Sequence, residues 1–298
     1  MRFLTKITFV LIVLFSIGAC QQNQSSSATT STSDEATKSQ RIVSLSGLLT
    51  EVLFELGYGD QIVGRDVTST YPAEAQALPD LGHVSKLNVE AILALKPDVI
   101  FVEESQKSKA TLTQLSQAGI ELIFVSTSFY ISNAINAARV IGQHLHTDPQ
   151  IIDQMAQKIE ADSLQLVEQI AKYSEQPKVL FIYARGAGRL MVAGKNTSAA
   201  AIIERAGGKN AIQSFSDFRA LTPEALIEAS PEVILMFTSG LASLDGKSGL
   251  EQITGIPQTP AFKNNRIIAM DGHYLTAFGP RIVQAAIELS NKMHQKQS

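Results

Sequence analysis

Short apolar runs alternate along this chain with longer stretches whose apolar residues recur three or four positions apart. In the first half, the runs that predict buried strands are 41–45, 61–66, 98–103 and 121–126. The stretches between them, LLTEVLFELG, NVEAILALK and ATLTQLSQAG, have helical spacing, and Gly57, Pro97 and Gly119 mark the helix ends. Strands that alternate with helices predict a mostly parallel sheet covered on both faces.

The second half of the chain repeats this alternation. Predicted strands lie at 178–184, 188–194, 232–237 and 266–271. Between the halves, 148–175 has no internal glycine and one proline at its start, which predicts a single long helix. We therefore predict an α/β fold of two Rossmann-like lobes with mostly parallel sheets, joined by one long helix. A ligand cleft is expected between the lobes, outside the carboxyl ends of the strands.

The first forty residues have a different composition. Arg2 and Lys6 precede an apolar run that is too short for a comfortable membrane span, so 1–19 is expected to be a signal peptide. The sequence IGAC resembles the lipobox of bacterial lipoproteins, which implies lipid attachment at Cys20; the alternative is a single N-terminal membrane anchor. Cys20 is the only cysteine, which excludes an intrachain disulfide.

These features predict five segments. They are the signal peptide (1–19), a lipidated cysteine with a polar flexible tether (20–40), an N-terminal α/β lobe (41–147), a connecting helix (148–176) and a C-terminal α/β lobe (177–298). The roughly 258 residues from Arg41 onward are enough for two lobes.

Charge and motifs exclude several functions. Without Arg2 and Lys6 the chain has 23 basic and 28 acidic side chains, a formal net charge of −5, and no basic run, so nucleic acid is not an expected partner. The chain contains no phosphate-binding loop and no nucleophile elbow, and the histidines form no metal motif. An enzyme is therefore the remote alternative to a binding protein.

One helix-and-strand unit occurs twice. LNVEAILALKPDVIFV at 87–102 returns as LTPEALIEASPEVILM at 221–236, with a glutamate at the same place in each copy, Glu90 and Glu224. Matching positions on the two lobes predict matching surface sites. The alternative is that Glu90 and Glu224 are ordinary acids in the first turn of a helix, where the helix dipole favours a negative charge.

From residue 41 onward, the chain resembles the substrate-binding components of ABC importers for iron chelates, haem and cobalamin, which have two lobes and one backbone helix. The resemblance implies that Glu90 and Glu224 dock into arginine pockets of a permease dimer, which works with its ATPase. It also implies a monomeric, extracytoplasmic protein, with its lipid anchor in the membrane, that facilitates transport without changing its ligand.

The ligand is indicated by TSTYP and LPDLG within 65–87, by VAGKNTSAAAIIERAGGKNA and by MDGHYLTAFGPR, which look like the HmuT/PhuT/ShuT-type haem-binding subgroup. The resemblance implies haem b as the transported ligand and Tyr71 as its axial iron ligand; a phenolate oxygen suits ferric iron. Judged without this resemblance, Tyr71 is an ordinary loop residue before Pro72. A ferric siderophore or cobalamin is the alternative cargo.

The chain departs from this subgroup at two places. His83, Val84 and Ser85 follow LPDLG where the subgroup has Tyr-x-Arg, so an expected arginine is missing. Lys86 is a candidate replacement cation, and His83 is either a second iron ligand or a surface residue. Arg185 stands where some relatives have an iron-binding histidine. It cannot ligate iron, and we expect it to bind a haem propionate.

Haem also needs flat apolar partners, and the chain has no tryptophan. Aromatic side chains in the predicted loops are candidates for ring contacts, and each also fits an ordinary core or loop position. They are Phe129, Tyr130, Tyr183, Tyr274 and Phe278.

Overall fold

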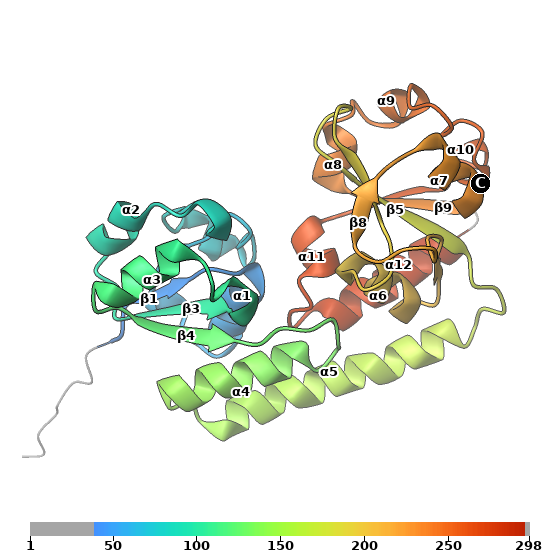
Figure 1. Cartoon of the computed structure of the whole chain (residues 1–298). Helices are drawn as coiled ribbons and strands as arrows, with labels where there is room; N and C mark the ends of the chain where they lie inside the picture. Colours follow the sequence, from blue (N-terminus) through green and yellow to red (C-terminus); the bar gives the residue numbers. More distant parts are fainter. Residues whose placement is uncertain (1–38, 296–298) are drawn as a thin grey trace, which may run out of the picture. The chain divides into compact units, whose positions relative to one another are not determined.

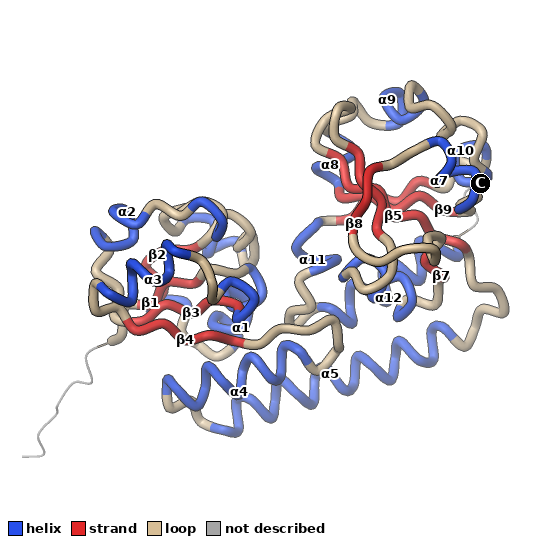
Figure 2. The backbone as a smooth tube through the Cα atoms, in the orientation of Figure 1, coloured by secondary structure: helices blue, strands red, loops and turns tan. Residues whose placement is uncertain are grey.

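The computed structural model describes residues 39–295 and contains two β-sheets (Figures 1 and 2). The signal peptide, Cys20 and almost all of the tether lie outside the described residues. Sheet A has the order β2-β1-β3-β4, and all of its pairings are parallel. Its strands are β1 (Ile42–Ser44), β2 (Ile62–Arg65), β3 (Val99–Glu103) and β4 (Glu121–Val125). The four strands predicted in the first half are confirmed, each trimmed at its ends.

Sheet B is mixed. Its main path is β10-β9-β5-β6-β8, and β7 pairs with β5 off this path. Its strands are β5 (Lys178–Ala184), β6 (Leu190–Ala193), β7 (Lys209–Asn210), β8 (Phe218–Ala220), β9 (Val233–Phe237) and β10 (Ile267–Met270). The pairings of β10 with β9, of β9 with β5 and of β7 with β5 are parallel, whereas β6 pairs antiparallel with β5 and β8. The sequence pattern did not predict β7 and β8, which are short.

Helices flank both sheets (Figure 1). The first half contains α1 (Gly47–Glu55), α2 (Val89–Ala94), α3 (Ala110–Gln117) and α4 (Asn133–Leu145). The second half contains α6 (Ser198–Arg205), α7 (Pro223–Ala229), α8 (Thr238–Ala242), α9 (Lys247–Glu251), α10 (Pro260–Lys263), α11 (Gly272–Thr276) and α12 (Ile282–His294).

The connecting helix α5 spans Pro149–Ile170. Asp148 caps it by accepting a hydrogen bond from the Gln150 amide, and Pro149 occupies the first turn, where the missing N–H costs nothing. α5 packs against α4 on one side and α12 on the other. One buried hydrophobic cluster runs through these contacts, from Leu49 of α1 and Ile159 of α5 to Phe181 of β5.

Local chemistry sets several helix ends. Gly57 and Gly119 adopt the left-handed conformation (φ +86° at each) after α1 and α3, where a Cβ would be strained. Asn88 and Thr222 cap α2 and α7 by accepting from the amides of Ala91 and Ala225, so the two copies of the repeat begin in the same way.

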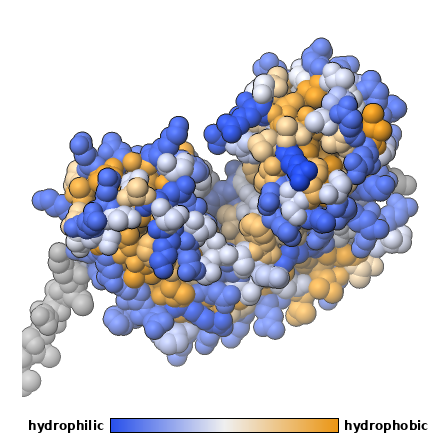
Figure 3. Space-filling view, viewed as in Figure 1, coloured by the Kyte–Doolittle hydropathy of each residue, from blue (hydrophilic) through white to orange (hydrophobic). Residues whose placement is uncertain are grey.

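On the face drawn in Figure 3, hydrophilic residues surround several hydrophobic patches. Within residues 39–295, no helix combines the length and apolarity needed to cross a bilayer.

Candidate functional site

A cavity of about 830 Å³ lies in the described structure, and its volume is within the range of small-molecule sites. Its wall combines residues of both halves of the chain. From the first half come Ser46, Gly47, Leu48, Thr68, Thr70, Glu103, Thr127, Ser128, Phe129 and Asn133. From the second half come Tyr183, Ala184, Arg185, Phe237, Ser239, Ser243, Asp271, Gly272, His273, Thr276 and Ala277. The ends of β3 and β5 and the residue that follows β10 thus contribute to one site, as expected for the carboxyl edges of parallel strands.

Opposite charges face this cavity from the two halves. Glu103, at the end of β3, accepts hydrogen bonds from Ser46 Oγ (2.6 Å) and Thr127 Oγ1 (3.3 Å). Arg185, directly after β5, is exposed, and its guanidinium lies 5.7 Å from the centroid of the Tyr183 ring. Aromatic faces beside a free cation suit a flat ligand that carries anionic groups.

Tyr71 lies close to this cavity in sequence, directly after Thr70, which lines it. Its own side chain is 39% exposed and borders a separate hollow of about 480 Å³ with Phe54, Pro72 and Glu74. The guanidinium carbon of Arg281 lies 3.3 Å from the centroid of the Tyr71 ring and 5.0 Å from that of Tyr274. Tyr71 therefore has a cation beside it, and that cation comes from the other half of the chain.

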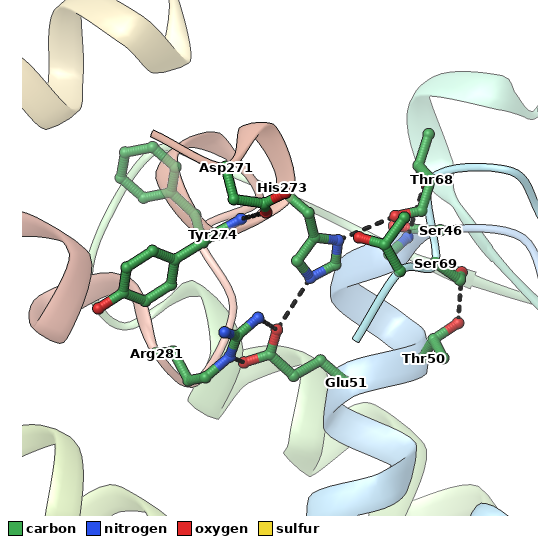
Figure 4. Close-up of polar contacts among 12 residues, drawn as sticks. Ser46, Thr50, Glu51, Thr68, Ser69, Asp271, His273, Tyr274 and Arg281 are labelled. Atoms are coloured by element: carbon green, nitrogen blue, oxygen red, sulfur yellow. Dashed lines mark hydrogen bonds and ion pairs between the residues drawn. The ribbon is translucent and has the colours of Figure 1, made fainter. Parts of the chain in front are cut away.

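Arg281 is held by a buried carboxylate (Figure 4). Its Nε and Nη2 donate to Glu51 Oε1 (2.8 Å) and Oε2 (3.0 Å), and His273 Nε2 lies 2.9 Å from Oε2. The side chain of Glu51 is 2% exposed. Burial raises the pKa of Glu51, but the hydrogen bonds from His273 and Arg281 and the attraction of their charges outweigh it, so the pKa lies below its ordinary value.

Tyr274 lies next to Arg281, in the short helix α11. Its amide donates to the side chain of Asp271, which caps α11, and its ring lies beside Arg281. Burial, with a contribution from the negative charge of Glu288, raises the pKa of Tyr274 above its ordinary value, so its hydroxyl stays protonated near neutral pH and can donate a hydrogen bond.

The structure separates the other predicted contacts. His83 and Lys86 are exposed, and His83 Nδ1 accepts from the Ser85 amide at the start of a 3₁₀ helix. Phe278 is 1% exposed, with Phe129 and Arg205 against its ring, so in this conformation it has almost no surface to offer a ligand. No group of three or more metal-ligating side chains occurs within residues 39–295.

The repeated glutamates occupy equivalent positions. Glu90 and Glu224 both lie in the first turn of a capped helix, α2 or α7, and both are exposed. An aliphatic residue follows three positions later in each copy: Leu93 is 39% exposed and Ile227 is 78% exposed. The structure thus presents the same pair of side-chain types, an acid and an aliphatic, at two places.

Sequence reasoning missed Glu51 and the roles of His273 and Arg281 around it. One signal was available: Glu51 lies between Leu48 and Val52 on the apolar face of the predicted helix, where an isolated acid needs a partner. The identity of the partner could not be read, because His273 and Arg281 lie more than 200 residues away.

Two α/β lobes with a helix between them and a cavity lined by both define a two-lobed ligand-binding protein. The chain belongs to the periplasmic binding protein family, whose match covers residues 42–274. Members of this family are substrate-binding components of ABC transporters rather than enzymes, and they work with permease and ATPase partners.

Three comparisons illustrate the relationship. The periplasmic haem-binding protein RhuT from Roseiflexus sp. RS-1, solved in its apo form, is 36% identical with a TM-score of 0.82, covering 86% of this chain and 98% of that one. An uncharacterised ABC transporter substrate-binding lipoprotein of Bacillus subtilis, YvrC, is 27% identical over 86% of this chain and 80% of its own length. A vitamin B12-binding protein of Yersinia pestis is 29% identical over 87% of this chain and 88% of its own length.

Proposed function

We propose that this protein binds haem b and delivers it to an ABC importer, with Tyr71 as the iron ligand. The observation that carries the proposal is the guanidinium of Arg281, 3.3 Å from the centroid of the Tyr71 ring. A phenolate is a hard oxygen donor suited to ferric iron, and Arg281 places a positive charge beside the ring that would carry this negative charge. The similarity to haem-binding RhuT, with 36% identity, supports the same cargo.

The other contacts have distinct roles in this proposal. Arg185 binds a propionate, since it is exposed and lines the cavity. Tyr274 supplies ring contact and a hydroxyl donor beside Arg281. Arg281 takes the place beside Tyr71 that Lys86 was expected to fill, and the role of Lys86 as a propionate contact stays a sequence prediction. His83 and Phe278 stay sequence predictions, for a second iron ligand and a ring contact.

Cobalamin or a ferric siderophore is the second candidate cargo. The observation that favours it is the number of hydroxyl groups in the cavity wall, which suit the amide side chains of cobalamin as hydrogen-bond partners. They come from Ser46, Thr68, Thr70, Thr127, Ser128, Ser239 and Ser243. The vitamin B12-binding relative, 29% identical, points the same way.

Delivery rests on the two repeated sites. Glu90 and Glu224 dock into the two subunits of the permease dimer, each through an acid flanked by an exposed aliphatic residue. The binding protein itself acts as a monomer, anchored by lipid on Cys20 and facing the periplasm or the cell exterior. The lipoprotein relative YvrC supports this anchoring.

The test is a titration of the full chain, in detergent, with ferric haem and separately with cyanocobalamin. Wild type and Tyr71→Phe are compared, with Tyr173→Phe as the control because Tyr173 stacks on His294, and neither residue lines the cavity. Tight haem binding with a tyrosinate-to-iron charge-transfer band that only Tyr71→Phe abolishes is the expected result. A band that survives Tyr71→Phe refutes the ligand assignment, and tight cobalamin binding without haem binding changes the cargo.

A further inference from the structure

Two parts of the chain that are far apart in sequence meet at the Glu51 carboxylate. Glu51 comes from α1, His273 from α11, and Arg281 from the turn before α12. Their side chains are 2%, 5% and 19% exposed. We call these three residues the clasp (Figure 4). A buried carboxylate with partners on distant segments ties those segments together, because separating them would leave charges without partners.

The ring of His273 has an acceptor at each nitrogen. Nδ1 lies 3.0 Å from the backbone carbonyl oxygen of Thr68, and Nε2 lies 2.9 Å from Glu51 Oε2. A carbonyl and a carboxylate only accept, so both contacts are hydrogen bonds when the ring carries both protons.

Two glycines make room for the clasp. A Cβ on Gly47 would collide with the His273 ring and would lie 2.7 Å from the Thr68 oxygen. A Cβ on Gly279 would lie 3.3 Å from both Cδ and Oε2 of Glu51. At Gly47 no other residue type fits without a shift of the ring or the backbone, and at Gly279 a side chain would fit only tightly against Glu51.

The loop that carries Tyr71 is attached to the same assembly. The Asp66 carboxylate accepts from Thr68 Oγ1 (2.8 Å) and Ser69 Oγ (2.7 Å), and Ser69 Oγ lies 2.7 Å from Thr50 Oγ1 of α1. Asp66, Ser69 and Thr50 are at most 2% exposed. Tyr71 therefore follows a loop that is fixed to α1 by buried hydrogen bonds, and the His273 contact with Thr68 joins this loop to α11.

We propose that Glu51 is a positioning residue, which acts with a doubly protonated His273 to hold Arg281 over the Tyr71 ring. The inference rests on the proposed role of Tyr71 as the iron ligand. The clasp thus links the contact between the two halves to the position of the iron-binding tyrosine. Helix α1 fixes the Tyr71 loop, and Glu51 fixes the Arg281 cation beside the Tyr71 ring.

The charged and titratable groups around the clasp are consistent with this role. The rings of Tyr71 and Tyr274 lie beside Arg281, and Asp66 is already paired with Thr68 and Ser69. Three further acids, Glu55, Asp60 and Glu74, border the hollow that Glu51 and Tyr71 share, and the charges of Glu288 and Asp162 act on Tyr274. Glu51 is thus the carboxylate in direct contact with His273 and Arg281.

The first test uses the ligand-free full chain and does not depend on haem. With ¹⁵N-labelled histidine, nuclear magnetic resonance at neutral pH should show both His273 ring nitrogens protonated, the signals being assigned by their loss in His273→Gln. Gly47→Ala should remove this signature because its methyl group occupies the place of the ring. Gly188→Ala is the control, since a Cβ there meets nothing within 4 Å. A singly protonated His273 ring in wild type would overturn the clasp.

The second test uses the ferric haem complex. Glu51→Gln keeps the shape but removes the charge, and we expect it to weaken haem affinity by roughly 10- to 100-fold and to shift the tyrosinate charge-transfer band. Glu55→Gln, exposed on the same helix, should do neither. If wild type binds haem through Tyr71 and both Glu51→Gln and Gly47→Ala leave band and affinity unchanged, the positioning role is refuted. If wild type binds no haem, the proposed cargo fails, and the ligand-free spectrum alone decides whether the clasp exists.

Discussion

Truncation of Glu51 to alanine should destabilise this protein far more than a typical surface substitution. In wild type the carboxylate contacts the Arg281 guanidinium and the His273 ring at 2.8–3.0 Å. Glu51→Ala leaves the Arg281 guanidinium and the His273 ring close together and largely buried, without the negative charge that compensates them.

The loss of stability in Glu51→Ala can be estimated from the burial of these charges. Two unit charges 4 Å apart attract by about 4 kcal/mol at an effective dielectric constant of about 20, and desolvation offsets much of this. Removal of one partner from a buried pair costs about 3–5 kcal/mol, because the remaining charge stays desolvated. At roughly 2–4 °C per kcal/mol, Tm should fall by about 10 °C.

Urea unfolding, followed by circular dichroism, measures this cost. A double-mutant cycle with Arg281→Ala should give a coupling free energy of about 2 kcal/mol, and Glu55→Ala on the exposed side of α1 should change stability by less than about 0.5 kcal/mol. Because the pKa of Glu51 is lowered by folding, its contribution is complete above the ordinary carboxyl pKa and is lost as the pH falls through the folded-state value. The wild-type advantage over Glu51→Ala should therefore shrink in acid. A cost below about 1 kcal/mol near neutral pH, or a cost that grows in acid, refutes the reasoning.

Three further outcomes follow from other parts of the structure. Charge reversal of Glu90 and Glu224 together to lysine should leave ligand affinity intact and stop transport in reconstituted vesicles, whereas Glu160→Lys/Glu168→Lys on the exposed side of α5 should transport normally; unchanged transport argues against docking through the repeat. Leu49→Ala, at a fully buried position, should cost about 2–5 kcal/mol in urea unfolding. Thr222→Ala should cost about 0.5–2 kcal/mol by loss of the α7 cap, and Thr222→Ser should retain it.

The order of strands and helices could be predicted from the sequence because periodicity is a local property. The eight strands expected from apolar runs occur, and β5 has the expected bounds of 178–184. Pairing direction is not local: the run at 188–194 became β6, which turns back against β5 because only a short turn, with Gly186 at φ +71°, separates them. The long helix ends at Ile170, earlier than expected, and the predicted lobe boundaries stay a prediction.

The candidate site was predicted only in part for the same reason. Short motifs identify Tyr71, Arg185 and Tyr274. Arg185 lines the cavity, Tyr71 follows Thr70 of its wall, and Tyr274 lies in the short helix α11 beside Arg281. The sequence predicts that the cation beside Tyr71 is Lys86, from the same loop. In the structure the cation is Arg281, 210 positions further along the chain. A residue's partner across two lobes depends on the tertiary arrangement, which no local pattern encodes.

The clasp and the shared core together restrict how ligand binding can work. Flexible linkers of extended strands would let the lobes separate. Here α5 packs on helices from both halves, and one hydrophobic cluster continues from α1 through α5 to β5. A large opening would expose that cluster and also break the buried contacts of Glu51, and both losses cost free energy. A large separation of the lobes is therefore costly, so ligand affinity should depend mainly on side chains whose positions the fold already sets. Glu51, as the proposed positioning residue for Arg281, would act on that affinity without touching the ligand.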